Sequence, residues 1–305
     1  MTLPPATGCF RLRDDPEVTV DLFGSVAILS FYRDAPDEAA LARALMERPD
    51  VRSVYVKRRP REARGASAEL LAPSTPLLGA PMDSLVVEEQ GARFEIRPGN
   101  GLSVGLYLDA RDARAWVRRH ARGRRVLNTF AYTCGFGVAA HLGGAARVVN
   151  VDASRKVLDW GEQNLTLNGF SPERHDFVAG DTFDWLKRFA KKGEQFDLII
   201  LDPPGFATTR TSRFTAQRDY HRLVAAAEPL LAPGASLLAM CNVEQLRLRD
   251  FEAQVRRGLG VRPFDVTERF GASAVDFRQP PALKCLVAQV SAHHPSGRGR
   301  AAAAP

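Results

Sequence analysis

A glycine turn followed by an acid at the end of the next apolar segment is the part of this sequence best suited to chemistry. Gly135, Gly137 and Ala140 fit the pattern G-x-G-x-x-A, and the apolar run 148–151 ends on Asp152. Glycine lets the backbone approach a ligand because it has no Cβ, and a carboxylate at a strand end can accept both hydroxyls of a ribose. The spacing predicts a site for a cofactor with an adenosine moiety. A glycine turn that only packs a helix on a strand is the alternative interpretation.

A second group of residues suited to chemistry follows the apolar run FDLIIL at 196–201. It consists of Asp202, Pro203, Pro204, Gly205 and Phe206. Two prolines fix an extended exit from the strand and remove two backbone donors, so the carboxylate and nearby carbonyls can be aimed at one substrate group. Phe206 is suited to stack on a flat base, and packing in the core is the alternative interpretation of this aromatic residue.

Alternating strands and helices must position these groups. Strands are expected at 126–127, 148–151, 177–178, 196–201, 235–240 and 282–290, and helices at 109–120, 138–142, 154–168, 182–189, 217–231 and 248–258. This alternation predicts an α/β fold with a doubly wound, mostly parallel sheet, in which ligands bind beyond the carboxyl ends of the strands. The glycine turn, Asp152, Asp202 and Asp181 all fall at that edge. Asp181 could equally cap the helix that follows it.

A small α+β domain is expected at 10–104, before a second domain at 105–292. Its expected elements are a hairpin or two strands at 14–33, a helix at 37–48, a strand at 51–57 and a hairpin at 85–97. Residues 58–82 are rich in Pro, Gly and Ala and are interpreted as a loop or linker, and 207–215 as a polar loop. Residues 293–305 are expected to form a disordered tail.

The composition is that of an ordinary globular protein, with 305 residues, 45% hydrophobic and 25% charged. No apolar run approaches the roughly 20 residues of a membrane span, and the N-terminus has no apolar secretory core, so we expect a cytoplasmic protein. The four scattered cysteines show neither zinc-binding spacing nor a disulfide framework, and no metal is expected. A net charge of +7 suits an anionic partner such as nucleic acid. The oligomeric state does not follow from the sequence.

The densest basic run is RRHARGRR at 118–125. It is either a solvated helix end with its loop or a surface that contacts RNA phosphates. The candidates for RNA contact are Arg111, Arg118, Arg119, Arg122, Arg124, Arg125 and Arg210, with Lys57, Arg58 and Arg59 as a second group.

Several stretches in this order resemble one family. They are GLYLDARD at 105–112, LNTFAYT at 127–133, VDAS at 151–154, Asn164-Leu165 with Leu167-Asn168-Gly169, and LDPPGF at 201–206. Together with the glycine turn they are similar to class I S-adenosylmethionine-dependent methyltransferases. The closer resemblance, over roughly residues 15–290, is to the bacterial 23S ribosomal RNA large-subunit methyltransferases.

The resemblance implies a Rossmann-like domain, S-adenosylmethionine as the cofactor and 23S ribosomal RNA as the partner. In such a site Asp152 would hold the ribose, Asp181 the adenine region, and the backbone at Gly135 and Gly137 the floor. The remaining implied cofactor contacts are Asn128, Tyr132, Thr133, Ala153, Ser154 and Asp202. Residues 202–206 would hold a base that has been flipped out of its stack.

The family divides into a cytosine-C5 branch and a guanine-N2 branch, and this sequence has features of both. Methylation of C5 requires a thiolate that attacks C6, and Cys241 stands where the cytosine branch carries its cysteine. The helix from Ser154 and the run Gln217-Arg218-Asp219 resemble the guanine branch, and Met240 and Asn242 flank Cys241 in place of serines. A small buried cysteine at a strand end is the alternative to a nucleophile. The catalytic candidates are Asp202, Pro203, Pro204, Phe206 and Cys241.

Three departures from the family's pattern leave the pocket and the RNA target open. Ala110 replaces a usual Gln, Cys134 replaces a usual Gly, and the chain has no room for the RNA-binding PUA domain of the cytosine branch. Two other classes of protein are considered. One is a nicotinamide-dependent oxidoreductase with the same glycine turn, against which the Asp-Pro-Pro-Gly-Phe stretch argues, and the other is an RNA-binding protein without activity.

Overall fold

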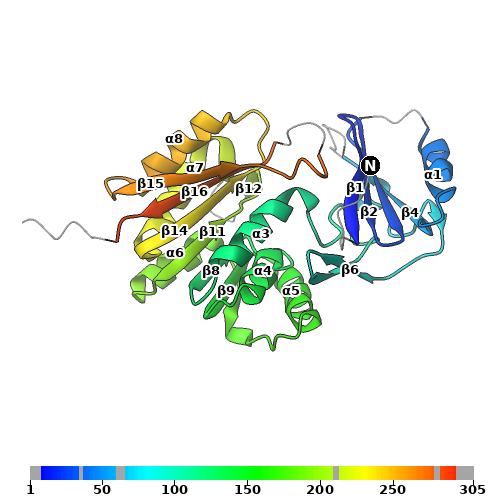
Figure 1. Cartoon of the computed structure of the whole chain (residues 1–305). Coiled ribbons are helices and arrows are strands. Elements are labelled where there is room, and N and C mark those ends of the chain that lie inside the picture. The colour runs from blue at the N-terminus through cyan, green and yellow to red at the C-terminus, as the bar shows by residue number, and fades with distance from the viewer. Residues whose placement is uncertain (1–7, 34–36, 60–65, 209–212, 278–281, 293–305) are drawn as a thin grey trace, which may run out of the picture.

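The computed structural model describes residues 8–33, 37–59, 66–208, 213–277 and 282–292. Its larger sheet has seven strands in the order β10-β9-β8-β11-β14-β16-β15 (Figure 1). They are β8 (Arg125–Thr129), β9 (Arg147–Asp152), β10 (Phe177–Ala179), β11 (Phe196–Leu201), β14 (Leu231–Cys241), β15 (Phe264–Phe270) and β16 (Lys284–Val290). The first five pair in parallel, and β16 and β15 pair antiparallel. The predicted doubly wound, mostly parallel α/β fold is confirmed.

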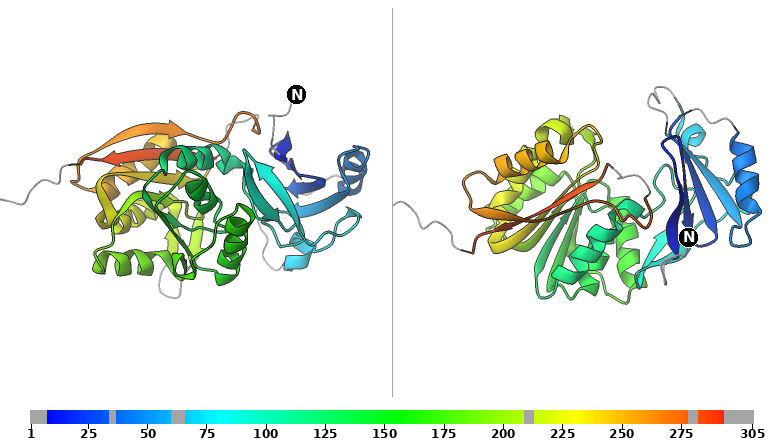
Figure 2. Two further views of the ribbon diagram at one scale, coloured as in Figure 1. Left: turned by 60° about the horizontal axis from the view of Figure 1, so that its bottom comes forward. Right: turned by 45° about the horizontal axis from the view of Figure 1, so that its top comes forward.

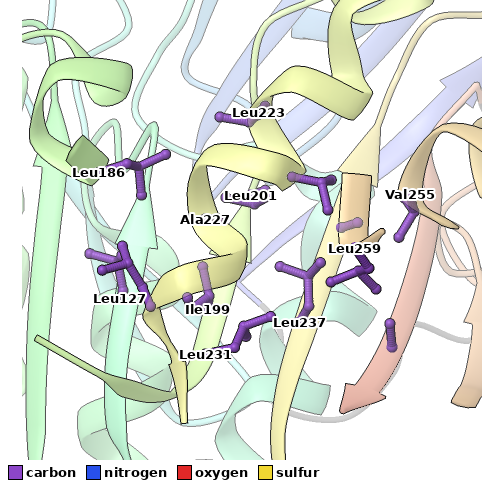
Figure 3. Packing of buried hydrophobic residues seen from close by; sticks show 14 of the residues in the cluster. Leu127, Leu186, Ile199, Leu201, Leu223, Ala227, Leu231, Leu237, Val255 and Leu259 are labelled. Carbon is purple, nitrogen blue, oxygen red and sulfur yellow. The ribbon is translucent and has the colours of Figure 1, made fainter. Parts of the chain in front are cut away.

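Helices cover both faces of this sheet. They are α3 (Arg111–His120), α4 (Gly135–Leu142), α5 (Arg155–Leu167), α6 (Thr182–Lys191), α7 (Ala216–Ala227) and α8 (Leu248–Leu259). Because successive strand residues point to opposite faces, Ile199 of β11 packs under α6, α7 and α8, whereas its neighbour Ile200 packs under α3 and α4. Figure 3 shows residues of the first cluster, among them Leu223 of α7, Leu201 of β11 and Leu237 of β14.

A smaller sheet precedes the larger one and confirms the expected small α+β domain. It has the order β1-β2-β3-β4-β5, from β1 (Cys9–Asp14), β2 (Val18–Phe23), β3 (Val26–Phe31), β4 (Ser53–Arg58) and β5 (Leu78–Gly79). Helix α1 (Glu38–Met46) connects the parallel strands β3 and β4 and buries Ala42 and Leu45 against the sheet. Figure 2 shows this sheet to one side of the larger one.

A hairpin of β6 (Leu85–Glu89) and β7 (Ala92–Ile96) joins the two parts. One hydrophobic cluster contains Val26 of the small sheet, Phe94 of the hairpin, Leu106, and Leu158 of α5. A buried ion cluster lies beside it. Glu89 accepts hydrogen bonds from Arg111 and Arg114 of α3, and Arg111 also pairs with Asp276 and donates to the carbonyl oxygen of Cys9 at 2.6 Å.

Several elements differ from the prediction. Strands β1 and β15 were not predicted, and the segment 58–82 contains α2 (Ala68–Leu71) and β5 in addition to loop. Helix α7 ends at Ala227, where a short 3-10 turn with Pro229 follows, so β14 begins at Leu231. The expected polar loop contains β12 (Phe206–Thr208) and β13 (Arg213–Thr215), and Arg210 lies outside the described residues, as does the expected tail. Within the described ranges, no helix is long and apolar enough to span a membrane.

Candidate functional site

The carboxyl ends of four neighbouring strands bring several predicted groups to one edge of the larger sheet. Loop 130–134 follows β8, Asp152 ends β9, Asp181 lies just after β10, and Asp202 lies directly after β11. Because β10, β9, β8 and β11 are adjacent and parallel, these groups line a single edge. This is the edge at which doubly wound sheets bind their ligands.

Asp152 organises the backbone at this edge. Its carboxylate accepts the N–H of Tyr132 and the N–H of Ser154, each at 2.9 Å. A carboxylate has about four acceptor positions, so two bonds leave capacity for the hydroxyls of a ribose. Ala153 and Ser154 are exposed beside it at the start of α5. These features fit the predicted role of Asp152.

The loop after β8 has an unusual backbone. Phe130, Tyr132 and Cys134 have φ angles of 54°, 49° and 59°, in the left-handed region. Each such residue costs about 1–2 kcal/mol in a non-glycine position. Strain of this kind persists only where neighbouring contacts hold the backbone, and it is concentrated at ligand sites. The loop is therefore shaped for more than the connection of β8 to α4.

The Thr133 prediction is corrected by the contacts that hold this loop. Its side chain is buried and donates to the carbonyl oxygen of Gly105 at 2.6 Å, while its own carbonyl accepts a bond from Asn164 at 2.9 Å. Thr133 therefore fixes the loop and does not offer its hydroxyl to a ligand.

Cys134 packs into space left by a glycine of α5, since a Cβ on Gly161 would lie 2.3 Å from the Cys134 Sγ.

The assignment of Asn128 to the cofactor is also corrected, and Gly137 has a packing role beside it. Asn128 is buried inside the sheet layer and donates to Oδ1 of Asn150 at 2.9 Å. A Cβ on Gly137 would lie 2.5 Å from that same oxygen. Gly137 therefore lets α4 pack closely on β9, which is the alternative interpretation of the glycine turn. Gly135, in contrast, has only ordinary side-chain neighbours.

Asp181 caps the helix that follows it, as its position suggested. One carboxylate oxygen caps α6 by accepting the N–H of Asp184 at 3.1 Å. The side chain is only half-buried, so its other oxygen has acceptor capacity for a ligand at the carboxyl edge.

Asp202 lies in a setting that favours its neutral form. Burial and, to a smaller extent, the nearby charge of Asp109 raise its pKa to about 7, while Arg114 acts in the opposite direction. Burial also raises the pKa of Asp109, which lies in the 3-10 turn before α3. Asp109 is not among the site residues predicted from the sequence. The only signal was its place in the stretch GLYLDARD, directly before a helix.

Tyr220 of α7 holds the strand ends that carry the catalytic candidates. Its buried hydroxyl donates to the carbonyl oxygen of Leu201 at 2.9 Å and accepts the N–H of Met240 at 3.0 Å. Tyr220 thus links β11 to β14. Its two partners, Leu201 and Met240, directly precede Asp202 and Cys241 in the sequence. Nothing in the sequence pattern predicted this role.

The prolines after Asp202 lead to an exposed aromatic ring. Pro203 is buried, Pro204 is exposed, and Phe206 begins β12 with 57% of its surface exposed. The carbonyl of Gly205 accepts the N–H of Ala216 at 3.0 Å, which anchors this exit on α7. Phe206 is therefore available for stacking, and its alternative interpretation as a core residue is wrong.

Cys241 lies at the end of β14 and its side chain is fully buried. Burial raises the pKa of the thiol, and the charge of Asp202 acts in the same direction, whereas Lys284 and a backbone bond from Val243 lower it. The ammonium of Lys284 donates to the carbonyl oxygens of Val243 and Ala282. A thiol with this raised pKa is protonated at neutral pH.

The structure does not bring Arg111 or the run 118–125 to the carboxyl edge. Arg111 is buried in the ion cluster with Glu89 and Asp276, so its assignment to RNA is corrected. The run 118–125 lies at the end of α3 and at the amino end of β8, opposite the site. Arg124 donates to Ser236, and the N–H of Arg125 donates to Asp197 at the start of β11.

The second basic group is also largely internal. Lys57 is buried, and its ammonium donates a hydrogen bond to the carbonyl oxygen of Pro98 at 2.7 Å. Burial lowers the pKa of Lys57 to about 8. Arg58 is bound to Glu38 at 2.7 Å. Arg59 is half-buried and donates to the carbonyl oxygen of Leu102. In the described part of the chain, no group of three or more His, Cys, Asp or Glu side chains is arranged to hold a metal ion.

Comparison with known proteins agrees with this geometry. Residues 13–254 match the family described as S-adenosylmethionine-dependent methyltransferase. A relative from Aeromonas salmonicida named ribosomal RNA large subunit methyltransferase I is 44% identical over 158 residues, which cover 52% of this chain and 40% of the relative. A protein of the same name from Erwinia tasmaniensis is 37% identical over 226 residues, which cover 73% of this chain and 57% of that protein. The chain thus spans about half the length of these curated relatives.

Solved structures share the fold. A methyltransferase crystallised in complex with SAH has a TM-score of 0.83 at 24% identity, over 94% of this chain and 76% of that one. A methyltransferase from Agrobacterium tumefaciens has a TM-score of 0.69 at 17% identity, over 96% of this chain and 93% of that one. The match to the family over most of the sequence gives S-adenosylmethionine as the cofactor. The chain belongs to the S-adenosylmethionine-dependent methyltransferases.

Proposed function

We propose that this protein methylates a base of 23S ribosomal RNA. The names of the relatives motivate the choice of RNA, and a single observation in the structure supports it best. Asp202, whose carboxyl borders the cofactor edge, is followed by the exposed ring of Phe206. A carboxyl that orients a base edge and a ring that stacks on the base face are what a flipped nucleotide requires.

The residues at the carboxyl edge fit S-adenosylmethionine, which supplies an activated methyl group when bound. Asp152 would hold the ribose hydroxyls, and Asp181 would contact the adenine region. The transfer then depends mainly on placing the accepting atom in line with the methyl group. Asp202 would accept a hydrogen bond from the exocyclic amine of the base, and Pro203 and Pro204 would fix that geometry.

We further propose that the accepting atom is an exocyclic amine, such as guanine N2. Carbon 5 of cytosine needs a thiolate nucleophile, and reactive cysteines are partly exposed in electropositive surroundings. Cys241 is fully buried and its pKa is raised, which disfavours this chemistry. Asp202 would orient an amine without any covalent step.

The function is tested by methyl transfer to defined RNA. The purified protein is incubated with methyl-labelled S-adenosylmethionine and large-subunit ribosomal RNA, and the product base is identified by mass spectrometry. We expect Asp202→Asn and Phe206→Leu to lose most activity, and the exposed control Asp184→Asn to retain it. Binding of S-adenosylmethionine without transfer to ribosomal RNA at any assembly stage would contradict the proposed substrate and favour an RNA-binding protein without activity.

The accepting atom is tested at Cys241. We expect Cys241→Ala to keep methyl transfer, and the wild-type protein to form no covalent adduct with RNA that contains 5-fluorocytosine. Loss of transfer together with an adduct in the wild type would assign the reaction to carbon 5 of cytosine. Calorimetry with S-adenosylmethionine and NAD addresses the oxidoreductase alternative, which the family match does not support.

A further inference from the structure

We propose that Tyr107 is a base-stacking residue that binds an unpaired nucleotide of the RNA next to the one that is methylated. This inference rests on the proposed function in one respect, namely that the partner is RNA. Tyr107 lies outside the Asp202–Phe206 stretch, and the surface proposed to bind RNA lies between the small sheet and the cofactor edge.

The ring of Tyr107 is exposed but firmly supported. Half of its surface is exposed, and its other side packs on Tyr132 with the ring centroids 5.6 Å apart. Tyr132 packs on Trp160 at 6.2 Å, and the guanidinium of Arg97 lies 4.3 Å from the Trp160 ring. The hydroxyl of Tyr107 is 2.5 Å from that of Ser103. A ring held in this way binds a base with little further loss of side-chain freedom.

Tyr107 and Phe206 are the two most exposed aromatic side chains in the described ranges. Exposed rings bind single-stranded bases of any sequence because every base has a π-face. The loop after β8 is the proposed site of the adenosine cofactor, whereas Tyr107 lies outside that loop and half of its surface is exposed to solvent. The ring therefore suits a polymer that passes across the surface.

The chain around Tyr107 links it to both parts of the site. Two residues before it, the carbonyl of Gly105 holds Thr133 of the cofactor loop. Two residues after it, Asp109 lies close enough for its charge to act on Asp202. A base on Tyr107 would thus be a near neighbour of a base held at Asp202.

Arg59 adds a positive charge to this surface. Its guanidinium donates to the carbonyl oxygen of Leu102 and its charge reaches Tyr132. No ion pair joins it to a carboxylate of the described residues. A cation that is not neutralised by the protein can bind an RNA phosphate, and aromatic rings beside such cations form the usual surface for single strands.

The experiment measures binding of a short single-stranded RNA that contains 2-aminopurine to the full chain in the presence of SAH. Stacking quenches the fluorescence of this base. We expect Tyr107→Ala to weaken binding about tenfold and to lose the quenching, and Tyr107→Phe to remain within about twofold of the wild type. Arg59→Gln should weaken binding and lower the salt dependence, while Arg33→Gln, an exposed residue shortly after β3, serves as its control. Unfolding temperature and calorimetric affinity for S-adenosylmethionine are measured for each variant.

Three outcomes would overturn the inference. In the first, the wild-type protein neither binds the RNA nor quenches its fluorescence. In the second, Tyr107→Ala binds the RNA as the wild type does. In the third, Tyr107→Ala loses affinity for S-adenosylmethionine to the same extent as it loses affinity for RNA. The last result would place the ring in the cofactor pocket. Quenching that depends on Tyr107 in a protein that does not methylate ribosomal RNA would support this inference while contradicting the proposed substrate.

Discussion

The protonation of Asp202 is expected to depend on which form of the cofactor is bound. Burial raises its pKa to about 7, so the carboxyl is largely protonated in weakly acidic solution. S-adenosylmethionine carries a positive sulfonium, and a nearby positive charge favours the carboxylate. SAH has no such charge.

We therefore predict that S-adenosylmethionine releases a proton when it binds at about pH 6.5, and that SAH does not. The measurement is calorimetry in buffers with different ionisation enthalpies. The release should disappear well above about pH 7, where the carboxyl is already ionised, and in Asp202→Asn. Equal proton release by both ligands would show that Asp202 lies too far from the sulfonium to respond to it.

The pair Cys134 and Gly161 gives a second prediction at the scale of single residues. A helical Gly→Ala change normally stabilises by about 1 kcal/mol, but here the new Cβ would lie 2.3 Å from the Cys134 Sγ. We expect Gly161→Ala to destabilise by about 1–3 kcal/mol. In the Cys134→Gly background the same change should be neutral or stabilising. Urea unfolding of the two single variants and the double variant measures the coupling, and additive effects would contradict the packing.

Among the elements, the hairpin β6–β7 depends on a buried charge. Glu89 is bound to both Arg111 and Arg114, and all three side chains are buried. Glu89→Ala leaves two guanidinium groups with too few partners, and we predict a loss of about 3–5 kcal/mol in unfolding free energy. Asp15→Ala removes the exposed pair with Arg13 and should cost less than about 1 kcal/mol. Equal effects of the two variants would argue against the special role of burial.

Most elements of the larger sheet could be predicted because their apolar pattern is strong. Strand β11 is apolar except for Asp197, and α6 and α8 have apolar residues at helical spacing. Strand β15 could not be predicted in this way, because it is an edge strand with the mostly polar sequence FDVTERF. The early start of β14 was obscured by Pro233 and Gly234, which normally argue against a strand.

The candidate site was predictable only where local sequence determines it. Asp152 and Asp202 could be proposed because Asp152 ends one apolar strand and Asp202 directly follows another. Tyr220 and Asp109 were missed, since their roles depend on contacts with residues distant in sequence. The cofactor role expected for Asn128 is corrected because of another contact that the sequence does not reveal. The Asn128 side-chain amide donates a hydrogen bond to Asn150 on the neighbouring strand.

At the scale of the whole molecule, the positive charge is not concentrated at the site. The run 118–125 lies at the amino ends of the strands, on the opposite edge from Asp202. We therefore predict that replacing the exposed Arg119 and Arg122 together by Gln leaves the slope of log affinity for RNA against log salt nearly unchanged. Each phosphate contact contributes about 0.7 to that slope for a single strand, so a decrease of about 1.4 would assign the run to RNA binding.

The hydrophobic cluster that passes from the small sheet through the hairpin to α5 also governs how the chain can be divided. Leu106, Leu108 and Leu158 complete their burial against Phe23 and Phe94. A fragment that begins at residue 105 would expose these leucines to water, and the N-terminal fragment would expose the opposing face. The two sheets are therefore expected to melt in one cooperative transition, and limited proteolysis should not release a stable catalytic core at this point.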